Sequence, residues 1–225
     1  MLKFHLMSKK AIVLLSGGLD STTTLYYALD KGYQCYALIF DYGQRHKREL
    51  RSALAVASGV KIPYQILKIK LPWKGSALLD LRTEVPKNRR TKELMNGKTS
   101  EIPSTYVPAR NIIFLSFALS FAEASGAEAI FIGANAIDFS GYPDCRPEFY
   151  KAFQKVIQTG TKAKKIKILT PLIKMTKAEI IKLGQKLGAP LGKTWSCYLG
   201  GKKPCGVCDS CRIREKGMGE AENHK

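Results

Sequence analysis

Residues 11–24 read AIVLLSGGLDSTTT, and the interpretation of the whole chain starts from this stretch. An uninterrupted apolar run at 11–15 ends in Ser-Gly-Gly at 16–18, and a helical pattern follows directly. This predicts a buried strand, a tight turn and a helix. Two glycines let the main chain approach a ligand, and the first N–H groups of the helix favour an anion. The turn therefore predicts a phosphate site, although similar turns also serve as plain connections, with Ser21 as the helix cap.

Apolar runs and helical patterns alternate along most of the chain. Thr176, Glu179 and Gly188 have the positions of a capping box and a helix stop around the last predicted helix. The alternation predicts an α/β fold with a doubly wound, five-stranded parallel sheet, whose ligands bind beyond the carboxyl ends of the strands. The predicted strands are 11–15, 33–40, 62–69, 128–133 and 166–169, and the predicted helices are 22–30, 46–58, 109–125, 148–158 and 177–187.

The turn sequence Ser-Gly-Gly-x-Asp-Ser resembles the PP-loop of the ATP pyrophosphatase family, whose members cleave ATP between the α- and β-phosphates. It lacks the Gly-Lys-Ser/Thr of a Walker loop. The resemblance implies an adenine nucleotide alpha hydrolase-like fold that uses ATP and Mg²⁺, with the adenine at the end of the second strand. The nucleotide-binding residues that it implies are Leu15, Ser16, Gly17, Gly18, Leu19, Asp20, Ser21, Thr22 and Phe40.

Composition limits the class of protein. The chain has 225 residues and 45% apolar content, enough for one good core with an appendage. Its 37 basic and 18 acidic side chains give a net charge of +19, which suits nucleotides or tRNA, but lysines spread over helices are also typical of solvated surface. The start of the chain, with Lys3 and His5, is unlike a signal peptide, and the longest apolar run, 112–122, is too short for a bilayer. We expect a cytoplasmic protein without membrane contact.

Four cysteines near the carboxyl end have metal-site spacing, with seven, two and two residues between them. Four thiolates from one short loop suit a tetrahedral structural Zn²⁺, because they leave no position open for water or substrate. An iron–sulfur cluster would use the same ligands, whereas disulfides are disfavoured in a reducing compartment. We expect a nucleotide-binding domain over 1–190 and a zinc-binding segment over 191–225. The proposed ligands are Cys197, Cys205, Cys208 and Cys211.

The loop at 133–149 follows the fourth predicted strand and mixes carboxylates, an arginine and aromatic rings with Gly and Pro. Such side chains can hydrogen-bond and stack on a planar, guanine-like ring. Spacing alone favours a simpler interpretation, an Asx-turn-rich connection with locally packed aromatic residues. The candidate substrate-binding residues are Asp138, Phe139, Tyr142, Asp144 and Arg146.

Together, four motifs resemble the QueC family of 7-cyano-7-deazaguanine synthases. They are SGGLDSTT at 16–23, VPARN at 107–111, GANAIDFSGYPDCRPEF at 133–149 and the four-cysteine loop. The resemblance covers almost the whole chain and is most specific over 138–148. It implies an ATP-dependent ligase that converts 7-carboxy-7-deazaguanine and ammonia into the nitrile, in queuosine and archaeosine biosynthesis. It also implies a homodimer, with no need to bind tRNA directly.

The implied reaction forms an acyl adenylate, then an amide, and then the nitrile. Because negative charge develops on phosphate, positioned cations are expected to stabilise it. Lys177 lies at the predicted start of a helix, where the positive end of the helix dipole repels a cation, so its ammonium group favours an anionic partner. The simpler alternative is a lysine exposed to solvent. The candidate catalytic residues are Asp20, Arg110 and Lys177.

No residue presents itself as an obligatory general base. His46 is expected at the surface. If a group is needed to collect a proton, the candidates are Asp41 and Asp138. Residues 71–104 lack periodicity and contain a basic run at 87–92, which fits either a tolerated insertion or a lid over the site.

Two other functions fit some of these features. A PP-loop enzyme that thiolates tRNA would explain the positive charge, but it would need an RNA-binding domain or a catalytic cysteine pair for which the chain has no room. A zinc-containing nucleic-acid-binding regulator would bind tRNA or DNA, yet it would release no AMP from ATP.

Overall fold

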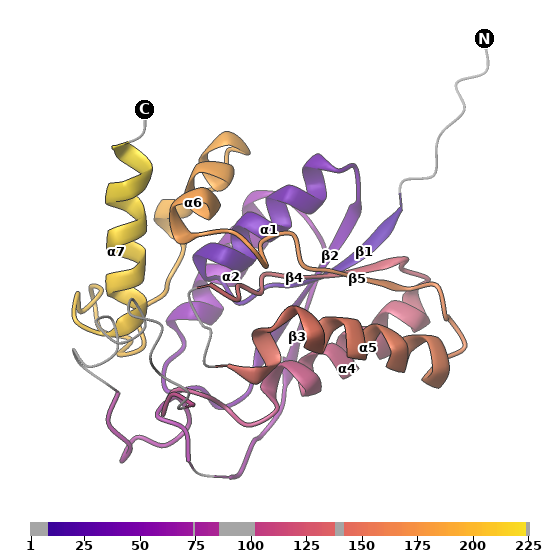
Figure 1. Ribbon diagram of the computed structural model, residues 1–225, viewed down its shortest axis with the longest axis horizontal. Coiled ribbons are helices and arrows are strands. Elements are labelled where there is room, and N and C mark those ends of the chain that lie inside the picture. The colour runs from indigo at the N-terminus through magenta and orange to yellow at the C-terminus, as the bar shows by residue number, and fades with distance from the viewer. Residues whose placement is uncertain (1–8, 74, 86–101, 138–141, 224–225) are drawn as a thin grey trace.

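Five parallel strands form one sheet in the computed structural model, which describes residues 9–73, 75–85, 102–137 and 142–223 (Figure 1). The order across the sheet is β3-β2-β1-β4-β5, and every neighbouring pair is parallel. The predicted five-stranded parallel sheet is confirmed. The strands are β1 (Lys10–Leu14), β2 (Gln34–Asp41), β3 (Tyr64–Lys68), β4 (Ala129–Ile132) and β5 (Lys167–Leu169).

The helices agree with the predicted pattern except at two places. The helix after the glycine turn begins at Leu19 instead of Thr22, because Gly18 and not Ser21 is its N-cap. The last helix was not predicted, because glycines and charges interrupt its apolar period. The elements are α1 (Leu19–Asp30), α2 (Arg48–Gly59), α4 (Arg110–Ser125), α5 (Pro147–Gly160), α6 (Lys177–Lys186) and α7 (Asp209–Glu222), with 3-10 turns η1 (Pro143–Cys145) and η2 (Leu191–Lys193). The capping box at the start of α6 is confirmed.

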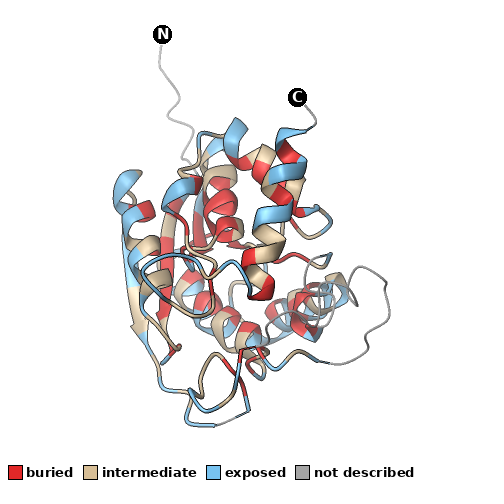
Figure 2. Ribbon diagram, turned by 90° about the vertical axis from the view of Figure 1, so that its left-hand side faces the viewer, coloured by how far each residue is buried: buried red, intermediate tan, exposed pale blue. Residues whose placement is uncertain are grey.

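Helices cover both faces of the sheet, as a doubly wound fold requires. Successive strand side chains point to opposite faces, so Val13 packs toward α1 and α2 while Ile12 packs toward α4 and α5. Figure 2 shows buried residues gathered in the strands and on the helix sides that face them. Each fully buried Leu or Ile contributes about 1.5–3 kcal/mol to stability. Fully buried members include Leu25, Leu38, Leu115 and Ile157.

A further apolar cluster joins the carboxyl-terminal part of the chain to α1. Leu19 packs with Ile180 and Ile181 of α6, Leu191 of η2 and Ala221 of α7. α6 and α7 lie side by side at one edge of the molecule (Figure 1). The domain boundary expected after residue 190 stays a prediction. Among the helices of the described ranges, none combines the length and apolar character that a membrane crossing needs.

The chain reverses its direction of travel across the sheet at β1. From β1 it proceeds to β2 and β3 on one side, and later returns to β4 and β5 on the other. The connections that leave β1 and β4 therefore diverge at the carboxyl edge, where such sheets bind ligands. Gly133 follows β4 there, and a Cβ on it would lie 2.8 Å from the backbone nitrogen of Ser21 and 2.9 Å from the carbonyl oxygen of Asp20. The end of β4 is thus packed directly on the start of α1.

Candidate active site

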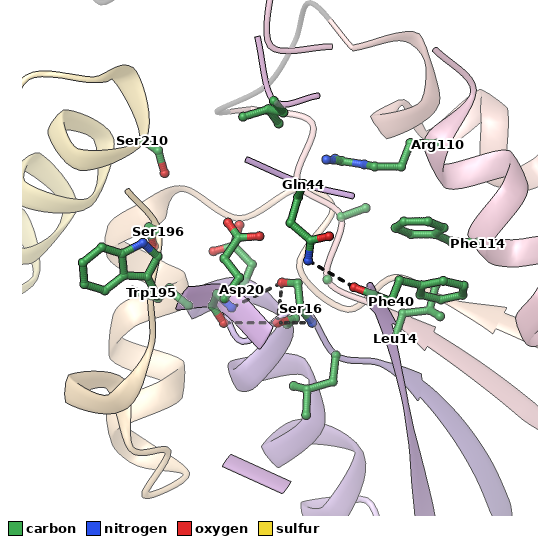
Figure 3. Close-up of a pocket in the computed structure, with 18 of the residues that line it drawn as sticks. Leu14, Ser16, Asp20, Phe40, Gln44, Arg110, Phe114, Trp195, Ser196 and Ser210 are labelled. Carbon is green, nitrogen blue, oxygen red and sulfur yellow. Dashed lines mark hydrogen bonds between the residues drawn. The ribbon is translucent and has the colours of Figure 1, made fainter. Parts of the chain in front are cut away.

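A cavity of about 260 Å³ lies at this carboxyl edge. Its walls come from the β1–α1 turn, the end of β2, the first turns of α2 and α4, and the segment after η2. In Figure 3, Ser16 and Asp20 lie between Trp195 on one side and Phe40 with Phe114 on the other. The rings of Phe40 and Phe114 stack, with centroids 3.9 Å apart. Polar side chains of the turn therefore lie between aromatic residues on two sides of the cavity.

Local hydrogen bonds fix the β1–α1 turn. The Gly18 backbone N–H donates to Ser16 Oγ (3.2 Å), Ser21 Oγ donates to the Gly18 carbonyl (3.1 Å), and the two serine hydroxyls are 3.0 Å apart. Of the nucleotide-binding residues implied by the PP-loop resemblance, Thr22 is buried away from the cavity and Gly17 faces α2. Those that line the cavity are Leu15, Ser16, Gly18, Leu19, Asp20, Ser21 and Phe40.

Gly17 is the point where α2 meets the turn. Its φ of +83° lies in the left-handed region, and a Cβ there would lie 2.3 Å from the Glu49 carbonyl oxygen and 2.4 Å from the Ala53 backbone nitrogen. Its carbonyl accepts a hydrogen bond from the Trp195 backbone N–H (2.9 Å). A side chain at position 17 would force apart three segments that are distant in sequence.

Gly17→Ala is expected to lower the free energy of unfolding by about 2–4 kcal/mol, because it adds a backbone clash to an unfavourable φ. The matched control is Gly32→Ala, since Gly32 has a similar φ of +78° but nothing within 4 Å of an added Cβ. The control should cost only about 1 kcal/mol. Urea denaturation of both variants measures the difference, and equal losses would contradict the close packing of α2 on the turn.

Asp20 and Lys177 form an ion pair inside the cavity. Lys177 Nζ lies 2.7 Å and 2.9 Å from the two carboxylate oxygens, and the side chains are only 10% and 17% exposed. Lys177 packs on α7 at Gly217, where an added Cβ would lie 2.5 Å from Lys177 Cγ. Breaking a largely buried pair strands a charge, so each partner depends on the other. The structure brings together the two candidate catalytic residues that are farthest apart in sequence.

Basic side chains outnumber acidic ones around the cavity. Arg110 Nη1 donates to the Tyr42 hydroxyl (3.5 Å), and Arg214 donates to the Leu191 carbonyl (2.8 Å). Burial lowers the pKa of Arg214, whereas the pKa of Arg110 is raised because neighbouring acidic groups outweigh its burial; both guanidinium groups stay charged. The cationic lining is Arg45, Arg110, Lys177 and Arg214, against the carboxylates Asp20 and Glu49. This excess favours a polyanion.

The expected substrate loop reaches the cavity only in part. Tyr142 lines it, with its hydroxyl 2.6 Å from Thr105 Oγ1. Asp144 is buried beside the cavity, and its carboxylate accepts the Asn111 backbone N–H (3.1 Å) at the start of α4. Arg146 is exposed and does not line the cavity. Asp138 and Phe139 lie outside the described residues, as does half of the expected lid, including its basic run at 87–92.

The four carboxyl-terminal cysteines form one cluster. Their Sγ atoms all lie within 4.8 Å of one another, and all four are free rather than disulfide-bonded. The Cys205 N–H donates to Cys197 Sγ and the Cys208 N–H to Cys205 Sγ, both at 3.4 Å. The donor set fits a tetrahedral metal site, as the spacing predicts.

Hydrogen bonds tie this cluster to residues of the cavity wall. The Cys197 carbonyl lies 2.9 Å from His46 Nε2 and 2.8 Å from Trp195 Nε1. His46 is half-buried and lines the cavity, so the surface position expected for it is wrong. A Cβ on Gly200 would lie 2.3 Å from the His46 ring. The segment that holds the cysteines thus braces the cavity wall.

Several cavity residues have no signal in the sequence. Gln44 fixes the turn after β2, because its side chain accepts the Tyr42 N–H (2.9 Å) and donates to the Phe40 carbonyl (3.3 Å). Asp41, considered as a base, pairs with Lys47 and does not line the cavity. The other unpredicted lining residues include Glu49, Asn111, Phe114, Trp195, Tyr198 and Arg214.

The chain is similar to known proteins in sequence and in fold. Residues 10–222 match the family model described as queuosine biosynthesis protein QueC. The 7-cyano-7-deazaguanine synthase of Cyanothece sp. is 56% identical over 217 residues, which is 91% of this chain and 93% of that protein. The same-named protein of Acetivibrio thermocellus is 56% identical over 218 residues, 95% and 94% of the two chains. A solved 4-thiouridine synthetase with RNA and ATP shares the fold, with a TM-score of 0.50, 20% identity and coverage of 96% of this chain and 51% of that one.

Proposed function

The chain belongs to the QueC family, and from this we infer that it is an ATP-dependent ligase that makes 7-cyano-7-deazaguanine from 7-carboxy-7-deazaguanine and ammonia. The product serves queuosine or archaeosine biosynthesis. One observation carries the inference: the PP-loop turn, the Asp20–Lys177 pair and Arg110 all line the same cavity. Such a site supplies an anion cradle and positioned cations, which adenylation of a carboxylate requires.

In the first half-reaction, we propose, ATP lies with its phosphates against the start of α1 and its adenine beside Phe40. The substrate carboxylate attacks the α-phosphorus and releases pyrophosphate. Lys177 and Arg110 stabilise the negative charge that develops on the phosphate oxygens. Ammonia then displaces AMP from the acyl adenylate and leaves the amide.

The second half-reaction repeats the activation on the amide oxygen. That oxygen leaves as part of AMP, and the carbon–nitrogen bond becomes the nitrile. Among the candidate substrate-binding residues within the described ranges, Tyr142 is the one that lines the cavity, so we propose that the deazaguanine ring lies beside it. Asp138, Phe139, Asp144 and Arg146 remain predicted substrate-binding residues.

Two metal ions are part of this proposal. Asp20 offers the carboxylate oxygens that Mg²⁺ prefers, at the place proposed for the phosphates, and Mg²⁺ there would neutralise phosphate charge. Cys197, Cys205, Cys208 and Cys211 would hold a structural Zn²⁺, whose binding free energy stabilises the fold. The homodimer and the cytoplasmic location expected from the sequence remain predictions.

Incubation of the pure protein with 7-carboxy-7-deazaguanine, ammonium, ATP and Mg²⁺ tests the proposal. Mass spectrometry should detect the nitrile, together with AMP and pyrophosphate. Omitting ammonium should stop the reaction before the amide. Sulfur transfer to tRNA would indicate a thiolating enzyme instead, and tRNA or DNA binding without AMP release would indicate a regulator.

A further inference from the structure

The proposed reaction requires a proton acceptor. Displacement of AMP by ammonia gives the amide, AMP and one proton. Conversion of the amide and ATP into nitrile, AMP and pyrophosphate releases the two protons still on nitrogen. A side chain that collects these protons must reach the reacting nitrogen and must be unprotonated at the working pH.

Among the described residues, Asp20 and Glu49 are the carboxylates that line the cavity. Asp20 is engaged with Lys177 through both of its oxygens. The Glu49 carboxylate takes part in no hydrogen bond or ion pair within the described ranges. Nearby, Asp41 pairs with Lys47 and Asp144 binds Asn111, and neither lines the cavity. Glu49 is therefore the cavity carboxylate that is left available.

Glu49 is also next to the part of the cavity where the chemistry is proposed. It lies in the first turn of α2, and its carbonyl is packed against Gly17 of the nucleotide turn. Arg110 of α4, Tyr42 after β2 and Tyr198 of the cysteine segment are the titratable groups that face it from other elements. Arg110 is too distant to form an ion pair, but its charge still acts on the carboxylate.

The protonation behaviour of Glu49 suits a base. Burial raises its pKa to about 7, and the positive charge of Arg110 opposes part of that rise. A base whose pKa lies near the working pH is largely unprotonated and still binds a proton strongly enough to remove it from nitrogen. The other half-buried titratable side chain nearby, His46, is held by the Cys197 carbonyl.

We propose that Glu49 is a catalytic residue that accepts the N–H protons when the amide becomes the nitrile. The first proton passes to its carboxylate as the amide oxygen is adenylated and the C=N bond forms. After that proton has moved to solvent, Glu49 takes the second as the C–O bond to AMP breaks and the C≡N bond forms. This role rests on the proposed function and gives it a base that the sequence does not reveal.

The test feeds the amide and ATP instead of the carboxylate, so that titration of ammonia does not enter the pH profile. With the wild-type protein, kcat should rise with pH through about 7, because Glu49 must lose its proton to act. Glu49→Gln should lower kcat at pH 8 by about 10²-fold or more and abolish that rising limb. Glu49→Asp should restore part of kcat, and its kcat should again rise with pH, but with a midpoint at a different pH.

Two controls separate the possible failures. Glu215→Gln removes an exposed carboxylate of α7 and should behave like the wild type. Exchange of labelled pyrophosphate into ATP with the carboxylate substrate should stay within a few-fold in Glu49→Gln, because adenylation needs no base. If kcat of Glu49→Gln still rises with pH as in the wild type, the proposal is overturned. A raised KM with unchanged kcat would also overturn it and would indicate that Glu49 recognises the substrate ring. A wild-type protein that makes no nitrile would instead refute the proposed function.

Discussion

Asp20→Asn is expected to lower kcat for nitrile formation by about 10³-fold, with little change in the fold. The substitution removes the charge that holds Lys177 at 2.7 Å within the cavity, so the ammonium group is no longer positioned for phosphate. It also removes the carboxylate proposed for Mg²⁺. Steady-state assays with saturating ATP and Mg²⁺ measure the loss, and circular dichroism checks the fold.

The matched control for this prediction is Asp30→Asn, at the other end of the same helix. Asp30 is half exposed and pairs with Lys31, so its loss should change kcat less than two-fold, roughly as expected for an exposed pair. If the Asp20–Lys177 pair acts as a unit, Lys177→Met should be nearly as severe, and the double variant should be little worse than either single one. Full activity in Asp20→Asn would remove Asp20 from the site.

Cys208→Ser is expected to have the largest effect on stability. A structural Zn²⁺ contributes about 10 kcal/mol of folding free energy, comparable with the whole stability of a domain. Losing one ligand should lower metal content and Tm together, and should reduce activity because the cysteine segment donates the Trp195 N–H to Gly17. Mass spectrometry measures the metal content, and thermal unfolding measures Tm. Chelation of the wild-type protein should give the same phenotype.

Cys35→Ala is the matched control for the metal site. Cys35 is a buried thiol on β2 and lies outside the cluster, so its loss should leave metal content unchanged and cost about 1 kcal/mol of stability. A Cys208→Ser protein with wild-type Tm would argue against a structural role for the metal.

Features encoded over short distances in the sequence were predictable. The apolar run 11–15 and the glycine turn specify β1 and the start of α1, and the capping box at Thr176 specifies the start of α6, because each depends on neighbouring residues. The cysteine spacing likewise predicted the observed cluster, since three of its ligands lie within seven residues. Identification of the family came from motifs of the same short-range kind.

Features that depend on packing between distant segments were not predictable. Glu49 enters the cavity because α2 packs on Gly17, and Arg214 enters it because α7 lies beside α6. Neither contact leaves a periodic trace in the sequence. In the loop at 133–149, a carboxylate oxygen of Asp144 accepts the N–H of Asn111 at the start of α4, a contact between distant segments that its residue type did not indicate.

Gly217 has a practical consequence for anyone who engineers a more heat-resistant version. Replacing helical glycine by alanine commonly adds up to about 1 kcal/mol, and α7 offers two such positions. Position 219 has open space, whereas a methyl group at 217 would meet the aliphatic stem of Lys177. Gly219→Ala should therefore raise heat resistance without disturbing the cavity. Gly217→Ala would instead displace the ammonium group of Lys177.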